Sequence, residues 1–594
     1  MDYYKAPLAE MTFLLEAFQY PERVQSLEAF EMFDIETLQA LLETTSNIAQ
    51  KELLPLNRVG DEEGIQWDPE TGDVTTPEGF KQAYQTMIDN GLFGVTGPAE
   101  YGGMGGPEIL GIFFSEIATA SNKSFSMCPG LTRGLVDALR AHGSDEQKEF
   151  YLPKLISGEW SGTMCLTEPQ CGTDLGLVRT KAIPQDDGSY KLTGTKIWIT
   201  FGEHDLADNI IHLVLARLPD APPGIKGIST FIVPKMIDGE RNAISCTGLE
   251  HKMGIKASPT CVMDMENATG YLVGTPNKGM RTMFVMMNAA RLHVGCEGIA
   301  LGEIAYQTAL AFAKDRRQSR SLDPEKQDAN AEADNILVHP DVRRMLLNVK
   351  TTTMALRALA TYIAVEYDVA HHHEDEEVRQ QADDLVALLT PIIKSYGSER
   401  GFENISEAMQ VCGGAGYTTD WNIEQYLRDE RIAMIYEGTN HIQALDLVGR
   451  KLPMKNGRLM QNFSARVTEL IRGCKDNEAL EPFVTPLKDA SKKLTAVTWE
   501  LAAKGAEDRE VAGAVASHYL NLFALTTLAF VWTIQAKYIV ENEVADGETR
   551  LKLGRYFMDK VLPEVDYLVS AIGSGKSNIV DAIKWVLGEQ SAKS

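Results

Sequence analysis

Apolar residues recur at helical spacing through about the first 155 residues of the chain. Three segments carry the clearest helical pattern: 35–52, 79–90 and 144–156. Ser144 is a capping residue at the start of the third segment, and Gly158 follows its end. The first part of the chain is therefore predicted to be a helical domain.

The pattern changes between about residues 160 and 275. Short β-branched and partly alternating runs occupy 190–201, 209–218, 227–234 and 260–265. Asp-Gly, Pro-Pro-Gly and Asp-Gly-Glu turns separate them. This part is predicted to be an antiparallel, barrel-like β domain.

Helical spacing returns after residue 280, over 281–314, 341–368, 378–409 and the segment that follows Glu437. A break at 453–457 precedes further helices up to about residue 570. The predicted fold class is α+β, with a helical N-terminal domain, a β middle domain, a C-terminal four-helix bundle and an extra helical domain. The expected boundaries are 1–34 (N-terminal extension), 35–158, 159–278, 279–450, 460–570 and a tail at 571–594.

Charge and cysteine usage narrow the function classes. Among 594 residues, 57 Lys and Arg stand against 83 Asp and Glu, which gives a net charge of -26. Such a chain repels nucleic acid and anionic membranes in general, so a polyanionic ligand needs a local basic pocket. Eight scattered cysteines without a C-x-x-C pair, and a start without a signal peptide, indicate a cytoplasmic protein.

Two further segments, the apolar run 519–540 and the histidine triplet 371–373, each allow two interpretations. The apolar run 519–540 is interrupted by Asn521, Gln535 and Lys537, which favours a buried bundle helix over a membrane span. The triplet His371 to His373 offers metal-binding side chains, but adjacent residues do not converge on one ion from a helix face. We therefore expect a solvent loop at the histidines and no metal site.

The strongest candidate for chemistry is the segment from Ile435 to Gln443. Thr439 or Asn440 is expected to cap the helix that follows, so Glu437 precedes a helix N-terminus. Exposed N–H groups at such an end favour negative charge, and apolar neighbours raise the pKa of a carboxylate. Glu437 is thus a candidate general base, although this segment taken alone favours a surface glutamate in a capped turn.

Other segments could hold a flat or phosphorylated ligand. The run 164–174 carries threonines in a turn after a strand, and period two puts Trp198 and Thr200 on one strand face. A tryptophan in a strand is also a common core residue. The cluster 315–320 suits a pyrophosphate or a helix C-terminus, and 410–417 is a glycine run after a helix.

Together, in this order and spacing, these segments resemble the acyl-CoA dehydrogenase family over about residues 35–450. The matching motifs are G-L-F-G-V-T-G-P-A-E-Y-G-G, L-T-E-P-Q-C-G-T-D, K-I-W-I-T, M-N-A-A-R, D-R-R-Q, Q-V-C-G-G-A-G-Y and Y-E-G-T-N. The opening Tyr4 to Leu8 and the helices beyond residue 460 resemble the long bacterial branch of that family.

The resemblance implies α,β-dehydrogenation of an acyl-CoA with FAD as cofactor. Glu437 would remove the α-proton, while the β-hydrogen leaves as a hydride to flavin N5. The implied substrate is 3-methylmercaptopropionyl-CoA or a fatty acyl-CoA, and the implied electron acceptor is electron-transfer flavoprotein. An acyl-CoA oxidase and a non-catalytic acyl-CoA or nucleotide-binding scaffold remain as alternatives.

The resemblance also assigns binding residues. The implied FAD contacts within one subunit are Met164, Leu166, Thr167, Gly172, Thr173, Trp198, Thr200, Thr439 and His441. The implied contacts to the FAD of a second subunit, and hence a homodimer or higher oligomer, come from Arg316, Gln318, Gln410 and Gly414. The implied substrate contacts are Asn288, Arg291, Tyr436 and Gly438.

Four features depart from the family pattern. Ser319 and Arg320 replace a frequent Phe-Gly, His441 replaces a frequent Gln or Gly, and Asn288 replaces a frequent Asp. The tail from Gly573 to Gln590 is similar to the phosphate-loop segment of chromosome-maintenance ATPases. Its first loop position is Ser570 instead of Gly, so a terminal helix or an acquired tail is favoured over nucleotide hydrolysis.

Overall fold

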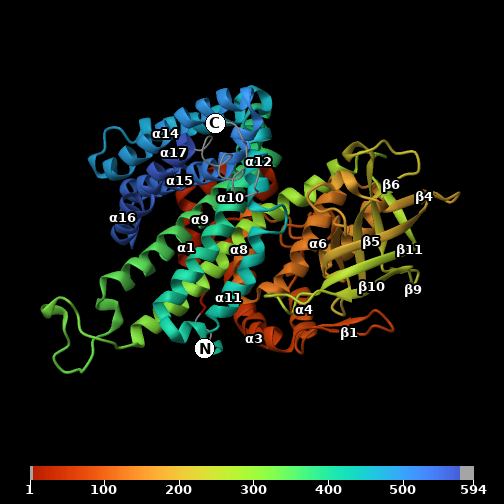
Figure 1. Ribbon diagram of the computed structural model, residues 1–594, viewed down its shortest axis with the longest axis horizontal. Coiled ribbons are helices and arrows are strands. Elements are labelled where there is room, and N and C mark those ends of the chain that lie inside the picture. The colour runs from red at the N-terminus through yellow and green to blue at the C-terminus, as the bar shows by residue number, and fades with distance from the viewer. Residues whose placement is uncertain (1–3, 575–594) are drawn as a thin grey trace, which may run out of the picture. The chain divides into compact units, whose positions relative to one another are not determined.

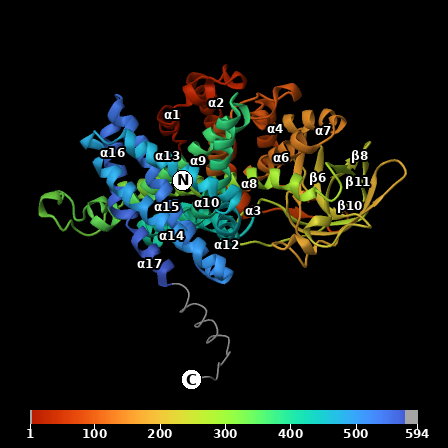
Figure 2. The same cartoon turned by 90° about the horizontal axis from the view of Figure 1, so that it is seen from above.

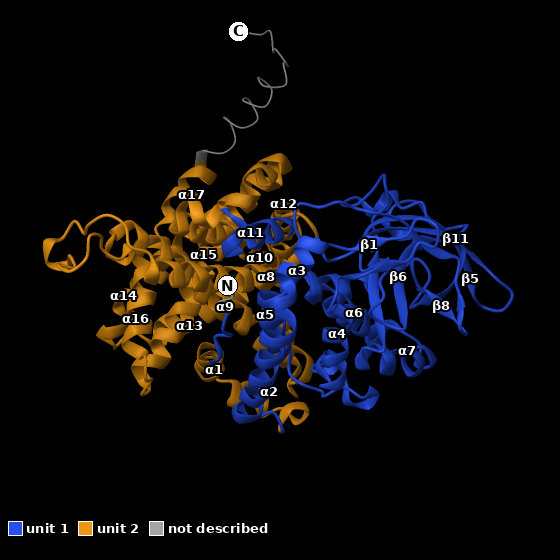
Figure 3. Ribbon diagram, turned by 90° about the horizontal axis from the view of Figure 1, so that it is seen from below, with its two compact units in different colours: residues 1–8, 32–293, 418–432 blue, residues 9–31, 294–417, 433–594 orange. Residues whose placement is uncertain are grey.

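The computed structural model describes residues 4–574, and the chain divides into two compact units (Figure 3). The first unit contains the described residues up to 8, with 32–293 and 418–432. The second contains 9–31, 294–417 and the described residues from 433 onward. The tail that resembles a phosphate loop lies outside the described residues except at 571–574, which form the end of helix α17 (Glu564–Ser574).

The helices of the first unit confirm the predicted helical N-terminal part. The N-terminal ones are α2 (Ile35–Ile48), α3 (Leu54–Glu63), α4 (Phe80–Asp89), α5 (Glu108–Ser121), α6 (Lys123–His142) and α7 (Asp145–Ser157). The unit also contains α11 (Ile423–Glu430), from a segment that was predicted to belong to the C-terminal bundle. Ser144 and Gln147 form a reciprocal capping box at the start of α7, and Gly158 ends it at φ +85°. The local signals read from the sequence therefore fix the ends of α7.

The first unit also contains a seven-stranded sheet. Its strands are β3 (Trp160–Cys165), β4 (Lys181–Pro184), β5 (Tyr190–Thr200), β6 (Asn209–Arg217), β7 (Ile228–Pro234), β10 (Ile244–Leu249) and β11 (Thr260–Val273). The order is β10-β11-β5-β4-β6-β3, and β7 pairs with both β11 and β6. These pairs close a ring, and α6 packs against β3 at its side (Figure 1).

Most strand pairs of the sheet are antiparallel, as predicted, but two pairs are parallel. β3 runs parallel to β6, from Trp160 opposite Asn209 to Cys165 opposite Val214. β4 also runs parallel to β6, where Lys181 lies opposite Arg217. β4 and β5 separate β3 from β6 along the chain, which gives the length that a parallel connection needs. Two short hairpins, β1 (Gln66–Trp67) with β2 (Val74–Thr75) and β8 (Met236–Ile237) with β9 (Glu240–Arg241), complete the strands.

The second unit is helical throughout its main elements. Helix α8 (Gly279–Asp315) continues into it from the first unit. The others are α1 (Leu8–Ala17), α9 (Pro340–His372), α10 (Glu376–Cys412), α12 (Asn440–Asp446), α13 (Arg458–Gly473), α14 (Glu481–Glu507), α15 (Arg509–Glu541), α16 (Gly547–Tyr556) and α17 (Glu564–Ser574). Figure 2 shows α14, α15 and α17 running beside one another.

Helix α15 forms the core of the extra helices. It is long and apolar enough to cross a membrane, but 78% of its most apolar window is buried inside the protein. Phe530 of α15 meets Tyr362 of α9 edge to face, with ring centroids 5.5 Å apart. The predicted buried bundle helix is therefore confirmed.

The N-terminal segment packs on the same unit. Glu10 of α1 forms a buried ion pair with Arg357 of α9, and Arg357 also donates to Glu303 of α8 at 2.9 Å. Arg550 of α16 lies 4.1 Å from the centre of the Phe13 ring. Residues 9–31 and the helices after residue 433 thus belong to one compact unit.

One loop prediction needs correction. His371 and His372 belong to the last turn of α9, because the helix continues to His372 before His373 caps it. The acidic segment 321–335 is a loop with one short 3-10 turn at Pro324–Lys326, and Asp334 inside it is buried and accepts hydrogen bonds from the N–H groups of Ser321 and Asp328.

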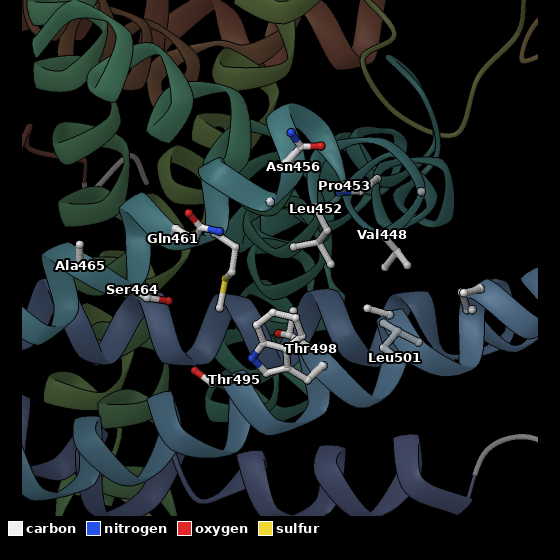
Figure 4. A pocket seen from close by; sticks show the side chains of 18 of the residues that line it. Val448, Leu452, Pro453, Asn456, Gln461, Ser464, Ala465, Thr495, Thr498 and Leu501 are labelled. Carbon is white, nitrogen blue, oxygen red and sulfur yellow. The ribbon is translucent and has the colours of Figure 1, made fainter. Parts of the chain in front are cut away.

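A cavity of about 1410 Å³ opens within the second unit. Figure 4 shows Leu452, Gln461, Ser464, Thr498 and Leu501 on its walls, which α13, α14 and the segment after α12 provide. None of the cofactor or substrate residues expected from the sequence lines it.

Candidate active site

In the first unit, the loop after β3 is anchored by a buried ion pair. Lys196 of β5 donates to the Glu168 carboxylate at 2.8 Å and to the Leu166 carbonyl at 3.0 Å, and both charged side chains are buried. The Thr180 hydroxyl and the Arg179 N–H also donate to Glu168. These bonds place the predicted flavin residues Leu166 and Thr167 beside β5.

The electrostatics of this anchor follow from burial and charge. Burial alone would raise the pKa of Glu168, but the charge of Lys196 and the donated hydrogen bonds outweigh it and lower that pKa from 4.5 to about 2. Glu168 is therefore an ionised structural group at neutral pH.

A bulge presents Trp198 to solvent. Cys261 pairs with Ile199 and Met263 with Lys196, so two residues of β5 face one of β11. Trp198 adopts φ +61° and is 60% exposed, whereas Lys196 is buried. An exposed tryptophan in a strained conformation is the kind of residue that a ligand covers, and the core interpretation of Trp198 is wrong.

The other predicted flavin residues of the first unit lie on β3, on β5 and in the loop after β3. Met164 and Thr200 are half-buried on β3 and β5, and the Ile197 N–H donates to the Thr167 carbonyl at 2.9 Å. Gly172 and Thr173 are exposed, and a side chain on Gly172 would meet only Thr167, at 3.5 Å. This open, polar edge fits a flat ring with a phosphate chain.

The predicted substrate residues Asn288 and Arg291 lie one turn apart on the first-unit part of α8. Asn288 is exposed, and Arg291 is 7% exposed. A buried guanidinium is a strong hydrogen-bond donor in a low-dielectric setting.

In the second unit, Glu437 occupies a left-handed turn just before α12. Its φ is +56°, and Gly438 follows at +83°. Thr439 caps α12, since its hydroxyl accepts from the Ile442 N–H at 3.4 Å, which confirms the predicted cap. Glu437 is half-buried and Ile435 is 47% exposed.

Side chains from α10 and α12 hold this turn. Lys394 of α10 donates to the Gly438 carbonyl at 2.7 Å and to Asn440 Oδ1 at 3.2 Å. Gln443 of α12 donates to the carbonyls of Glu437 at 3.0 Å and of Gly438 at 3.2 Å. The Tyr436 hydroxyl donates to Glu297 of α8.

Four predicted residues of the second unit share an exposed setting. They are Arg316, Gln318, Gln410 and Gly414. His441, also exposed, pairs through Nδ1 with the Ser517 hydroxyl at 3.1 Å. Exposed positions of this kind suit contacts to another subunit.

The sequence interpretation assigned no role to Glu168, Lys196, Lys394 or Gln443. One signal was present: Lys394 is a single cation after the apolar run from Leu388 to Ile393. Both lysines and Gln443 are fully buried, which only the tertiary structure reveals.

The first unit thus carries a strand ring with N-terminal helices, and the second unit carries a helical bundle with a carboxylate before a capped helix. Family profiles match in the same order: Acyl-CoA dehydrogenase, N-terminal domain (35–159), middle domain (163–268) and C-terminal domain (277–452), then Acetyl-CoA dehydrogenase C-terminal like (461–582). The chain belongs to the acyl-CoA dehydrogenase family.

Individual relatives agree with this assignment. The chain is 42% identical to 3-methylmercaptopropionyl-CoA dehydrogenase of Ruegeria pomeroyi, covering 94% of this chain and 96% of the relative. It is 32% identical to a butyryl-CoA dehydrogenase of Syntrophomonas wolfei, with 97% and 98% covered. The fold is similar to that of an acyl-CoA dehydrogenase complexed with FAD from Bacillus anthracis, with a TM-score of 0.75, 22% identity, and 95% and 93% covered.

Proposed function

We propose that this chain carries out the FAD-dependent dehydrogenation of an acyl-CoA thioester to the trans-2-enoyl-CoA. The observation that carries the proposal is Glu437, a half-buried carboxylate in a left-handed turn before a capped helix. Glu437 takes the α-proton, and its own N–H donates to the thioester carbonyl, which acidifies the α-carbon. When bound, FAD supplies a hydride acceptor for the β-hydrogen.

Different residues of the chain bind the flavin ring, the pyrophosphate and the substrate. Leu166, Thr167, Met164, Trp198 and Thr200 hold the flavin ring, and their open strand edges support this role. Gly172 and Thr173 bind the pyrophosphate, and Thr439 and His441 bind the same cofactor from the α12 side. Asn288, Arg291, Tyr436 and Gly438 hold the substrate.

The remaining roles concern partners. Arg316, Gln318, Gln410 and Gly414 reach the FAD of a second subunit in a homodimer or larger oligomer, and their exposure supports this. Electron-transfer flavoprotein accepts the electrons, and the enzyme works in the cytoplasm.

The substrate we propose is 3-methylmercaptopropionyl-CoA, because the relative of that name is 42% identical across 94% of this chain. A panel of acyl-CoA thioesters with thioether, straight, branched and aryl chains tests it by anaerobic bleaching of the flavin. Fastest bleaching by a straight-chain fatty acyl-CoA would reassign the substrate. Peroxide formed in step with substrate, without an added acceptor, would indicate an oxidase.

Glu437→Gln tests the base. The variant should retain FAD but reduce it at least about 1000-fold more slowly, because the proton acceptor is lost while the fold persists. Glu374→Gln, which removes an exposed carboxylate of the same unit, is the matched control and should reduce flavin normally. Unchanged bleaching in Glu437→Gln would contradict the assignment, and a protein that takes up no flavin would contradict the function.

A further inference from the structure

Two buried side chains converge on the turn that carries Glu437. Lys394 and Gln443 have no exposed surface, and between them they donate to the carbonyl oxygens of both Glu437 and Gly438. They reach the turn from separate helices, α10 and α12. The backbone on the C-terminal side of the base is therefore held from two directions.

This turn needs such support. Glu437 adopts φ +56°, a left-handed conformation that disfavours residues with a Cβ atom, and Gly438 continues it at +83°. An alternative extended conformation at residue 437 would rotate the N–H of Glu437 relative to its carboxylate, because φ is the torsion about the N–Cα bond that separates the two groups. The three hydrogen bonds to the carbonyls of Glu437 and Gly438 oppose that rotation, because they hold the C-terminal side of the turn in place.

The lysine is itself held in place. Its second bond goes to Asn440 Oδ1 at 3.2 Å, and Asn440 donates through Nδ2 to the Ser395 carbonyl at 3.0 Å. Ser398 also donates to Asn440 Oδ1 at 3.2 Å. The first residue of α12 and one turn of α10 are thereby joined around the Lys394 ammonium.

We propose that Lys394 and Gln443 are positioning residues for the catalytic base. They fix the left-handed turn so that the Glu437 carboxylate and N–H act on the same substrate carbon and carbonyl. The proposal rests on the proposed dehydrogenase function and extends it, since it names two side chains that act through the base without touching the reacting atoms.

The test compares Lys394→Met and Gln443→Met with wild type in single-turnover flavin reduction, using substrate with and without deuterium at the α-carbon. Each variant should keep bound FAD and substrate affinity but reduce flavin about 100-fold more slowly, because a base displaced by about 1 Å loses alignment. The α-deuterium isotope effect should rise, since proton removal becomes more rate-limiting.

The isotope effect distinguishes a misplaced catalytic base from a general loss of protein stability. Gln535→Met is the matched control, because Gln535 is also buried and donates to a backbone carbonyl, that of Val531 at 3.2 Å, within α15. That variant should lose some thermal stability and keep the wild-type isotope effect. Lys394→Met and Gln443→Met variants with normal rates and isotope effects would overturn the proposal.

Flavin bleaching in the wild-type protein tests the dehydrogenase function itself, independently of the positioning role. A wild-type protein that holds FAD but is not bleached by any acyl-CoA would defeat the dehydrogenase function itself. Bleaching of wild type, together with variants that lose rate only in proportion to their lost folded fraction, would defeat the positioning role alone.

Discussion

At the scale of single residues, the ion pair of Glu168 with Lys196 stabilises the loop that carries the predicted flavin residues Leu166 and Thr167. We predict that Glu168→Gln lowers the free energy of unfolding by about 3 kcal/mol at neutral pH, because Lys196 would stay buried without its counter-charge. Urea unfolding measures the change. Glu548→Gln is the control, since its pair with Lys552 is exposed to solvent and its loss should leave the stability unchanged.

The lowered pKa of Glu168 makes the free energy of unfolding depend on pH. Its pKa is about 2 in the folded protein and ordinarily 4.5, so its stabilisation is complete above pH 4.5 and is lost as the pH falls toward 2. The difference in unfolding free energy between wild type and Glu168→Gln should therefore shrink below pH 4.5. A constant difference down to pH 3 would contradict this account.

Residue types alone indicated the candidate base Glu437 and the capping residue Thr439, because a capping residue followed by a helical pattern is a local signal. It did not indicate that Trp198 is exposed. That exposure comes from the bulge opposite Val262, and pairing between β5 and β11 joins residues 60 or more positions apart.

At the scale of elements, the crossing of α8 and α10 depends on glycines. A Cβ atom on Gly298 would lie 2.1 Å from the Gly397 carbonyl oxygen, and one on Gly401 would lie 2.3 Å from the Gly298 Cα. We predict that Gly298→Ala lowers the free energy of unfolding by about 3 kcal/mol, because the helices must separate. Since α10 carries Lys394, flavin reduction should slow as well.

Denaturant unfolding and single-turnover reduction measure both effects. Gly130→Ala in α6 is the matched control, because nothing lies within 4 Å of the added atom. That change should be neutral or stabilise the helix by up to about 1 kcal/mol. Equal stability of the two variants would show that the helix crossing tolerates separation.

Helix and strand positions were predictable because each signal is local. The 3.6-residue pattern gave the long helices, and turn residues separated the strands. The parallel pairing of β3 with β6 was not predictable, since nothing in a strand's own residues states which neighbour it joins.

At the scale of the whole molecule, the terminal helices are part of one core. Asp384 of α10 is buried and accepts from Arg458 at 2.6 Å, and Phe530 packs on Tyr362. We predict that a chain ending at Gly457 aggregates on expression, because it exposes the apolar faces of α9 and α10. A chain ending at Ser574 keeps every described contact and should remain soluble with an unchanged melting temperature.

Soluble yield and thermal melting by circular dichroism provide the measurement. Recovery of the chain ending at Gly457 as a soluble, cooperatively melting protein would show that the extra helices form an independent domain. The N-terminal segment would then also need another partner, because Phe13 contacts Arg550 of α16.

The sequence by itself determined the order of helical and β regions, the acidic character, the motif set and the candidate base, because these depend on near neighbours and on residue types. Tertiary structure decided the exposure of Trp198, the burial of Glu168 with Lys196, and the Lys394 and Gln443 bonds to the turn of Glu437. Each of these joins residues whose distance in space is set only when the elements pack. Burial and hydrogen-bond partners are properties of that packing, and no local pattern encodes them.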